Sequence, residues 1–373
     1  MRLRSLFALA LVAAAPPPST SGYQPSGADE QGLWAEMAEF ERALGASKLL
    51  VHNPALLGYL ERVLCRTVGT SRCRATRLYL VRDPRFNASM APNGAMIVHT
   101  GLLLRVRSEA ELAAVLGHEF SHFEERHSLA NWRSARRTTN AVAFMSVLPA
   151  SYALAPLMLV AGHFAFSRDQ ERAADLGGLA AMRRAGYRAG AAADLWEHLR
   201  AEMDATGAAR KTRSRKDDRG LFATHPAEGD RMSYLRAAAA DDRAGEDGAD
   251  RYRAAVGPIW PMLVDDQIKR QDFGGSEYLL AALAQDGWTG PLLHARGELY
   301  RTRAKHGDLE AAAGFYREAI ARDDAPAEAW RGLGLALARA GDRDGARAVL
   351  GAYLQRRPDA PDRAMLASIG GLE

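Results

Sequence analysis

The spacing of apolar residues predicts a mostly helical chain with a short stretch of strands in its first third. Apolar positions recur at helical intervals over about residues 33–64 and again over 110–116. Between them, residues 77–81 and 95–99 have the length and the β-branched and aromatic character of strands, and a Pro-Asn-Gly turn signal precedes the second. Helices on both sides of a small sheet predict an α+β domain.

The last part of the chain repeats itself at an offset of 34 residues. The matched pairs are Gly307 with Gly341, Ala312 with Ala346, Tyr316 with Leu350, and Ala319 with Tyr353. This is the period of the tetratricopeptide repeat, a helix hairpin that buries small residues and stacks on its neighbours. Two copies fall short of the usual minimum of about three, so residues 278–293 or the preceding domain must complete the stack. We expect a helical solenoid over residues 257–373, after a linker-like acidic stretch at 241–250.

Residues 1–22 have the pattern of a secretory signal peptide. Arg2 and Arg4 precede the apolar run 6–12, and three alanines follow at a suitable cleavage position. The run is shorter than the ~20 residues that span a bilayer, and no cysteine follows it to carry a lipid anchor. The pattern therefore predicts export.

Composition and charge narrow the class of protein. The chain has 373 residues, of which 47% are hydrophobic and 25% charged, as in globular proteins of two or three domains. Its formal charge of +4, or +2 without Arg2 and Arg4, is too small to indicate a nucleic-acid partner. The two cysteines, Cys65 and Cys73, suit a local disulfide in an exported chain. Metal ligation and free thiols are the alternatives.

Metal-binding chemistry is indicated by an H-E-x-x-H sequence. His118 and His122 lie one helical turn apart, so both imidazoles can bind one metal ion, while Glu119 can reach a metal-bound water. Ser108 and Glu111 form an S-x-x-E pattern that predicts where this helix begins. Two stray histidines on a solvated helix are the alternative.

A catalytic zinc site needs a third protein ligand. His127 is one candidate, but Glu125 and Ser128 occupy the positions that hold glycine and histidine in H-E-x-x-H-x-x-G-x-x-H proteases. Glu171 is the better candidate, because Asp175 follows one turn later and is placed to orient an imidazole. An ordinary charged surface helix is the alternative.

An uncharged apolar run, 141–166, separates the histidines from Glu171. It is long enough for one membrane-spanning helix, but Pro149 and Pro156 interrupt it. One crossing would also place the candidate ligands on opposite sides of a membrane, and two crossings need about 40 residues. We expect a folded-back hairpin, either a lid or a peripheral membrane contact, with plain core helices as the alternative.

An ordered set of short motifs carries a family resemblance. The set comprises Asn87-Ala88, Pro92-Asn93-Gly94, Gly101-Leu102-Leu103, H-E-x-x-H with His127, the E-x-x-x-D of Glu171 and Asp175, Thr224-His225-Pro226 and Arg231. It resembles the HtpX and CAAX prenyl protease family of zinc metallopeptidases. With the leader and the repeats, it is most similar to the periplasmic, BepA-type (β-barrel assembly-enhancing) members. Asn93 departs from the glycine that family members often have.

The resemblance implies a zincin-type, gluzincin-like peptidase domain over residues 23–256 that binds one Zn2+ per chain. His118, His122 and Glu171 would be the ligands, and Glu119 would activate the zinc-bound water as catalytic base. Asp175 would be the proton donor, although its position equally suits orientation of a ligand. His225 is a hypothetical fourth ligand that holds the enzyme shut.

The implied function is periplasmic hydrolysis of misfolded or unassembled outer-membrane proteins. The repeats would recruit substrates or the outer-membrane assembly machinery, and the edge of the small sheet would pair with extended peptides. One alternative is a chaperone or scaffold that acts through the repeats, with incidental or repressed proteolysis. Another is an integral-membrane prenyl protease, against which the missing transmembrane helices count.

Overall fold

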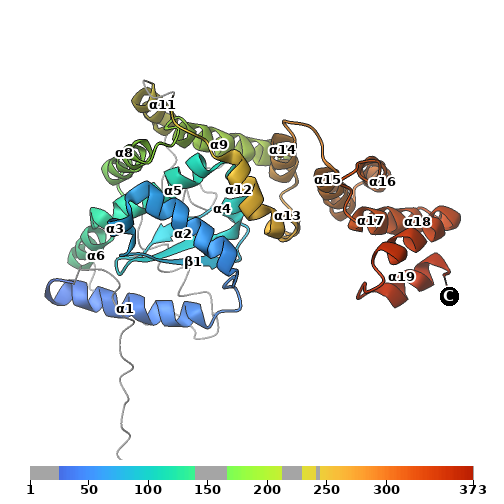
Figure 1. Ribbon diagram of the computed structural model, residues 1–373, viewed down its shortest axis with the longest axis horizontal. Coiled ribbons are helices and arrows are strands. Elements are labelled where there is room, and N and C mark those ends of the chain that lie inside the picture. Colours follow the sequence, from blue (N-terminus) through green and yellow to red (C-terminus); the bar gives the residue numbers. More distant parts are fainter. Residues whose placement is uncertain (1–24, 139–165, 212–228, 241–243, 373) are drawn as a thin grey trace, which may run out of the picture.

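The computed structural model describes residues 25–138, 166–211, 229–240 and 244–372. A sheet-containing domain forms the N-terminal part of the chain, and the repeat helices extend from one side of it (Figure 1). Within the described residues the chain is mostly helical with one three-stranded sheet, which confirms the α+β fold class.

The N-terminal domain is built from these elements: α1 (Gly27–Gly45), α2 (Pro54–Val68), α3 (Thr70–Cys73), β1 (Arg77–Val81), β2 (Ala88–Met90), β3 (Ala95–His99), α4 (Thr100–Arg105), α5 (Glu109–Glu124), α6 (His127–Thr138), α8 (Arg168–Arg184), α9 (Ala191–Ala209), α11 (Gly229–Ala239) and α12 (Ala249–Val256). The C-terminal part comprises η2 (Gly257–Ile259), α13 (Trp260–Lys269), α14 (Phe273–Leu283), α15 (Gly290–Arg303), α16 (Asp308–Ile320), α17 (Glu328–Arg339), α18 (Arg343–Arg356) and α19 (Arg363–Gly370).

The sheet has the strand order β1-β3-β2. β1 pairs with β3 in parallel, with Arg77 opposite Ala95, and β2 pairs with β3 antiparallel, with Ser89 opposite Ile97. All five residues of β3 are buried, as expected of a central strand. β2, which the sequence does not predict, is one edge of the sheet and packs near α5, so an edge strand lies beside the H-E-x-x-H helix.

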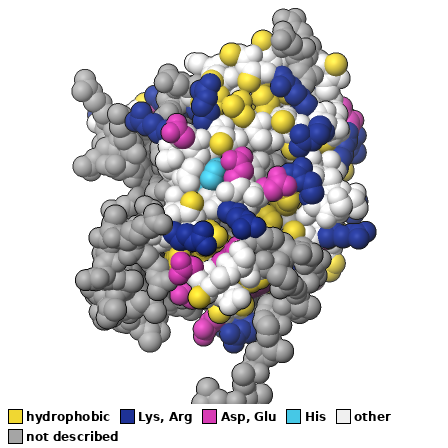
Figure 2. Space-filling view, turned by 90° about the vertical axis from the view of Figure 1, so that its left-hand side faces the viewer, with side chains coloured by type: hydrophobic (Ala, Val, Ile, Leu, Met, Phe, Trp, Pro, Cys, Tyr) yellow, Lys and Arg dark blue, Asp and Glu magenta, His cyan; other side chains and the backbone are white. Residues whose placement is uncertain are grey.

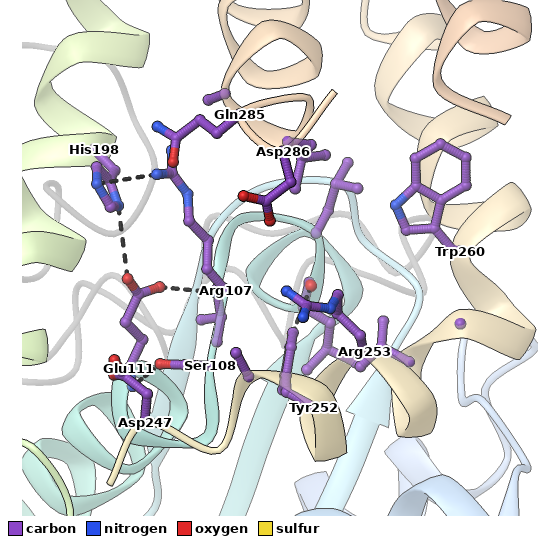
Figure 3. A pocket seen from close by; sticks show the side chains of 18 of the residues that line it. Arg107, Ser108, Glu111, His198, Asp247, Tyr252, Arg253, Trp260, Gln285 and Asp286 are labelled. Carbon is purple, nitrogen blue, oxygen red and sulfur yellow. Dashed lines mark hydrogen bonds and ion pairs between the residues drawn. The ribbon is translucent and has the colours of Figure 1, made fainter. Parts of the chain in front are cut away.

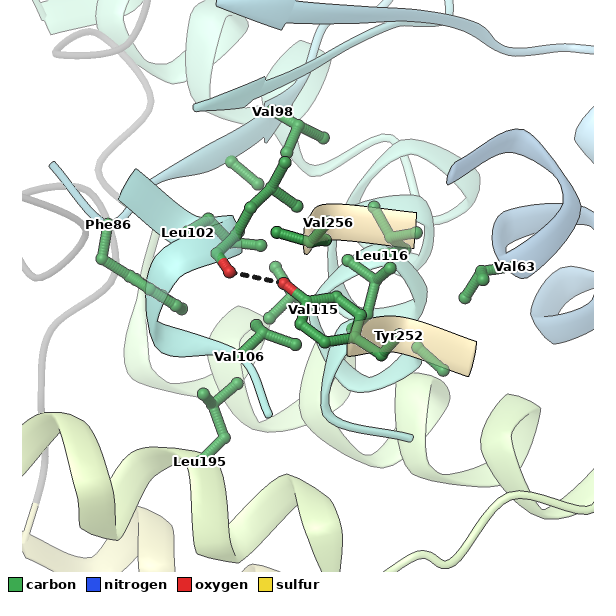
Figure 4. Packing of buried hydrophobic residues seen from close by; sticks show 14 of the residues in the cluster. Val63, Phe86, Val98, Leu102, Val106, Val115, Leu116, Leu195, Tyr252 and Val256 are labelled. Carbon is green, nitrogen blue, oxygen red and sulfur yellow. Dashed lines mark hydrogen bonds between the residues drawn. The ribbon is translucent and has the colours of Figure 1, made fainter. Parts of the chain in front are cut away.

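A large hydrophobic cluster holds α5 in the centre of this domain (Figure 4). Leu112 and Leu116 of α5 are fully buried in it. Tyr252 of α12 reaches the same cluster, and its hydroxyl donates to the carbonyl oxygen of Leu103 at 2.6 Å. The ring is buried in the cluster and the hydroxyl keeps a hydrogen-bond partner, so Tyr252 holds α12 against α4.

The start of α5 differs from the predicted capping box in one bond. Ser108 caps the helix by accepting from the backbone N–H of Glu111 at 3.1 Å. The carboxylate of Glu111, however, accepts from the N–H of Arg107 at 2.8 Å, one residue before the cap. A complete box occurs instead at α8, where Ser167 and Gln170 bond reciprocally.

Cys65 and Cys73 are joined by a disulfide that ties α2 to α3, with their Cα atoms 5.0 Å apart. The sequence favours this pairing over metal ligation and free thiols.

The repeat helices pack around small residues. A Cβ atom at Gly297 or Gly332 would lie 2.4 Å or 2.6 Å from the ring of Tyr316, which is fully buried between them. Glycine is therefore required where this ring fills the groove between α15 and α17.

The helices that precede the repeats pack with the N-terminal domain. α13 and α14 contribute Leu263 and Leu279 to the cluster that contains α5. The boundary at residue 257 therefore stays a prediction, because α13 packs with the peptidase side.

Two further expectations from the sequence concern a nucleic-acid partner and a membrane-spanning helix. Figure 2 shows basic and acidic side chains interspersed among the residues coloured on that face, rather than the basic field typical of nucleic-acid binding. No helix within the described ranges combines the length and the apolar character that a bilayer crossing needs. The apolar run 141–166 lies outside the described residues except for Phe166.

Candidate metal centre

Two glycines let the helices that carry the candidate ligands approach closely. Gly117 of α5 faces Gly178 of α8, and a Cβ atom at Gly178 would lie 2.9 Å from the backbone nitrogen of His118. Backbone thus packs directly on backbone at this crossing. The close approach brings the N-terminal half of α8 alongside the C-terminal half of α5.

Three candidate ligand atoms converge at this crossing. The Nε2 atoms of His118 and His122 are 3.1 Å apart. Glu171 places one carboxylate oxygen 3.7 Å from Nε2 of His118 and the other 3.5 Å from Nε2 of His122. One ligand atom from each residue lies within 4.8 Å of the others, and all three side chains are buried.

These distances fit one metal ion. In tetrahedral zinc sites nitrogen ligands bind at about 2.0–2.1 Å, which places two of them roughly 3.3–3.4 Å apart. The nitrogen separation of 3.1 Å is close to that value. Two imidazoles and one carboxylate are also a donor set that catalytic zinc sites use.

The other ring nitrogen of each imidazole has a partner that sets its orientation. Nδ1 of His118 lies 2.9 Å from Oδ1 of Asp175, and Nδ1 of His122 lies 2.9 Å from Nδ1 of His127. Each contact leaves Nε2 directed at the cluster, which is how metal-binding histidines are usually held. His127 is therefore placed behind a ligand, and Nε2 of His127 lies 3.2 Å from Glu125.

Asp175 is surrounded by donors from α11. Arg231 donates from Nε to Oδ2 at 2.6 Å and from Nη2 to Oδ1 at 2.5 Å, and the hydroxyl of Tyr234 also donates to this carboxylate. The guanidinium of Arg231 lies over the ring of Trp196, 3.8 Å from its centroid, and its Nη1 is 3.3 Å from Glu171. α11 thus supplies the side chains that hold Asp175 in place.

The charges at the centre set the protonation of Asp175. Burial alone would raise the pKa of Asp175, but the positive charge of Arg231 and the hydrogen bond with His118 outweigh it and hold the pKa well below its usual range. Burial likewise works against a charged His118, yet the hydrogen bond and charge of Asp175 raise the pKa of that imidazole. Asp175 is therefore ionised at neutral pH.

Glu119 lies next to the candidate ligands on α5 and is 2% exposed. It lines a small cavity together with His118, Asp175 and Trp196. A buried carboxylate beside the cluster has the position that a general base needs.

The structure thus brings together five of the residues singled out from the sequence: His118, Glu119, His122, Glu171 and Asp175. The sequence indicates Arg231 only as part of a motif, and it does not indicate Tyr234 or Trp196. Their roles at the centre are hard to predict from the sequence, because an aromatic or basic residue on a helix is usually structural. His225 and the leader 1–22 lie outside the described residues.

Comparisons with known proteins agree with this geometry. Residues 54–239 match the model of peptidase family M48, and residues 303–369 match a tetratricopeptide repeat model. The mitochondrial metalloendopeptidase OMA1 of Schizosaccharomyces pombe is 31% identical over 224 residues, which cover 59% of this chain and 62% of that protein.

Two bacterial relatives are more distant. The putative beta-barrel assembly-enhancing protease of Vibrio cholerae is 26% identical over 211 residues, 53% of this chain and 42% of that protein. The beta-barrel assembly-enhancing protease of Escherichia coli is 24% identical over 162 residues, 40% of this chain and 33% of that protein. In all three cases the matched segment is less than two thirds of the relative's own length. The chain therefore carries a peptidase M48 domain over residues 54–239, followed by a tetratricopeptide repeat segment.

Proposed function

We propose that this protein is an exported zinc-dependent endopeptidase whose metal is held by His118, His122 and Glu171. The observation that carries the proposal is the convergence of three buried ligand atoms within 4.8 Å, with the far side of both imidazoles held by a partner. The M48 match, with relatives named as metalloendopeptidases and proteases, supports the same activity.

The chemistry follows from the donor set. When bound, zinc supplies a Lewis acid that lowers the pKa of water to about 7 and polarises a carbonyl group. The carboxylate of Glu119 takes the proton of the attacking water and passes it to the leaving amine, as a general base and then a general acid. Burial of this carboxylate keeps it within the dry site, where its electrostatic effect is strongest.

Asp175 acts in this proposal by orienting His118 rather than by donating a proton. Its carboxylate accepts from Arg231 and Tyr234, and its pKa is held well below the usual range. An ionised carboxylate has no proton to give at neutral pH. Its negative charge instead fixes the tautomer of His118 that presents Nε2 to the metal.

The proposed substrates are polypeptides of the cell envelope, in particular misfolded or unassembled outer-membrane proteins. Relatives named beta-barrel assembly-enhancing proteases support this class, and the apolar run at residues 6–12 supports export to the periplasm. The tetratricopeptide segment would recruit substrates or assembly machinery. His225 as a fourth ligand, and 141–166 as a lid or membrane contact, remain part of this proposal.

The test compares the purified wild type with Glu119→Gln and Glu171→Ala. We expect one zinc per chain in the wild type and in Glu119→Gln, and loss of zinc in Glu171→Ala. Cleavage of an unfolded protein should fall by about 10²–10⁴-fold in Glu119→Gln, the range that general-base catalysis contributes. A wild type without zinc, or a Glu119→Gln variant that cleaves normally, contradicts the proposal.

The second candidate is a chaperone or scaffold, which the repeat segment favours. In cells that lack the protein, Glu119→Gln would then restore full function, whereas deletion of residues 290–373 would not. The peptidase proposal predicts that Glu119→Gln fails to restore it.

A further inference from the structure

A cavity lies at the junction between the peptidase domain and the first helices of the C-terminal part. It has a volume of about 640 Å³, within the range of ligand pockets. Its walls come from the start of α5, from α9 and α12, and from α14 and α15. None of the three candidate metal ligands lines it, so it is separate from the metal centre.

One end of the cavity is polar (Figure 3). Arg107 lies with Nη1 3.1 Å from Nε2 of His198, and Nδ1 of His198 lies 3.6 Å from the carboxylate of Glu111. The N–H of Arg107 donates to the same carboxylate. These three side chains offer both hydrogen-bond donors and acceptors at one place.

The remaining walls are largely apolar. Leu103 and Leu104 come from α4, while Leu283 and Leu292 come from α14 and α15. Trp260 stands at the end opposite to the polar trio in Figure 3. The cavity is therefore amphipathic, with the polar trio and the ring of Trp260 at opposite ends.

The charges around the cavity are mixed. The charged lining side chains are Arg107, Arg188, Arg253, Glu111, Asp194, Asp247 and Asp286. Arg188 is paired with both Asp194, at 2.7 Å, and Asp247, at 3.0 Å. The carboxylates disfavour an anionic ligand such as a phosphate, and the guanidinium groups disfavour a simple cation. A neutral chain of amides with apolar side chains can donate to the carboxylates and accept from the guanidinium groups, and it brings no net charge of its own.

We propose that this cavity is a second recognition site, which binds a short extended segment of a polypeptide. Its amides would bond at the polar trio and at the charged rim, and an apolar or aromatic side chain would lie towards Trp260. This proposal rests on the proposed function in one respect, because it takes the captured chain to be a substrate of the peptidase.

The position of the cavity suits that role. Glu111 and His118 belong to the same helix and are seven residues apart, which is about 10 Å along its axis. A segment held in the cavity keeps the rest of its chain at high effective concentration near the metal centre. Long unfolded chains would therefore be better substrates than short peptides.

Photo-crosslinking tests binding without requiring cleavage. A photoreactive phenylalanine replaces Gln285, which is exposed at the rim of the cavity, in the full chain carrying Glu119→Gln. The control position is Ala281, which is exposed on α14, four residues before Gln285, and does not line the cavity. The probe is fluorescent α-lactalbumin, kept unfolded by reduction and carbamidomethylation.

We expect strong crosslinking from position 285, weak crosslinking from 281, and competition by unlabelled unfolded protein but not by native α-lactalbumin or inorganic phosphate. Equal yields at the two positions overturn the proposal. So do competition by phosphate and crosslinking only to a second copy of the chain.

Filling the cavity tests its effect on catalysis. Ala282→Trp places an indole in the cavity, and Ala281→Trp places one on the solvent side of the same helix. We expect Ala282→Trp to lower kcat/KM for the unfolded protein by about tenfold, a modest loss of binding, and to leave a fluorogenic hexapeptide unaffected. Gln285→Trp, at the exposed rim, should act in the same way without touching packed residues.

Equal loss for both substrates, or no loss for either, contradicts the proposal. If the wild type cleaves neither substrate, the proposed peptidase function fails, while the crosslinking result still decides whether the cavity binds polypeptide.

Discussion

The crossing of α5 and α8 gives a direct test of how the candidate metal centre is assembled. In Gly178→Ala, the new Cβ atom would lie 2.9 Å from the backbone nitrogen of His118 and 3.2 Å from the backbone carbonyl carbon of Gly117. Ordinary contacts of a Cβ atom begin at 3.4 Å. Both neighbours are backbone atoms of a buried helix, so neither can rotate away. The helices must separate by roughly 0.5 Å at this point, which is the difference between 3.4 and 2.9 Å.

A displacement of that size matters for a metal site. Ligand distances in metal sites hold to about ±0.2 Å, so Glu171, seven residues earlier on α8, would no longer meet both imidazoles. We expect zinc affinity to fall by about 10–100-fold, the range seen when a residue that holds a ligand is lost. Overpacking should also lower the free energy of unfolding by about 1–3 kcal/mol.

Competition with a chromophoric chelator measures zinc affinity, and urea unfolding followed by circular dichroism measures stability. Gly314→Ala is the control, because this glycine is also in a helix and its Cβ atom would meet nothing within 4 Å. Unchanged zinc affinity in Gly178→Ala, with the fold intact, would refute the idea that this backbone contact sets the position of Glu171.

Three further predictions concern single groups. Asp175→Asn should lower zinc affinity by about 10–100-fold, because an amide cannot hold the His118 tautomer as a carboxylate does; equal affinity in the chelator assay would count against this role. Burial raises the pKa of Glu111 from 4.5 to about 7, so its contribution to stability is present below pH 4.5 and is lost, by up to roughly 3 kcal/mol, as the pH rises through 7. Urea unfolding of Glu111→Gln should lack this decline, and a parallel decline would rule out Glu111 as its source. Replacing Cys65 and Cys73 by serine should cost about 2.5 kcal/mol of unfolding free energy, from the chain entropy of a loop with a sequence separation of 8. A reducing agent should weaken the wild type by the same amount and leave the variant unchanged.

Short-range sequence patterns were sufficient to predict several elements of the fold and part of the candidate site. β1 and β3 occupy the residues that their composition predicted, 77–81 and 95–99, and the turn between β2 and β3 has its glycine at a positive φ of 89°. The H-E-x-x-H spacing placed two imidazoles on one helix face, and the 34-residue offset identified the repeats. Each of these depends on neighbours within one turn, one strand or one repeat, so the sequence alone determines it.

Contacts between distant segments were decided only by the tertiary structure. β2 has three residues and is stabilised by pairing with β3, so its composition gives little signal. The pairing of Arg231 with Asp175 joins residues that are 56 positions apart.

The junction cavity likewise needs walls from seven α-helices, from α4 to α15, that the chain brings together only on folding. Close packing selects such contacts by shape and charge across the whole core, and a periodic pattern along the chain does not record which faces will meet.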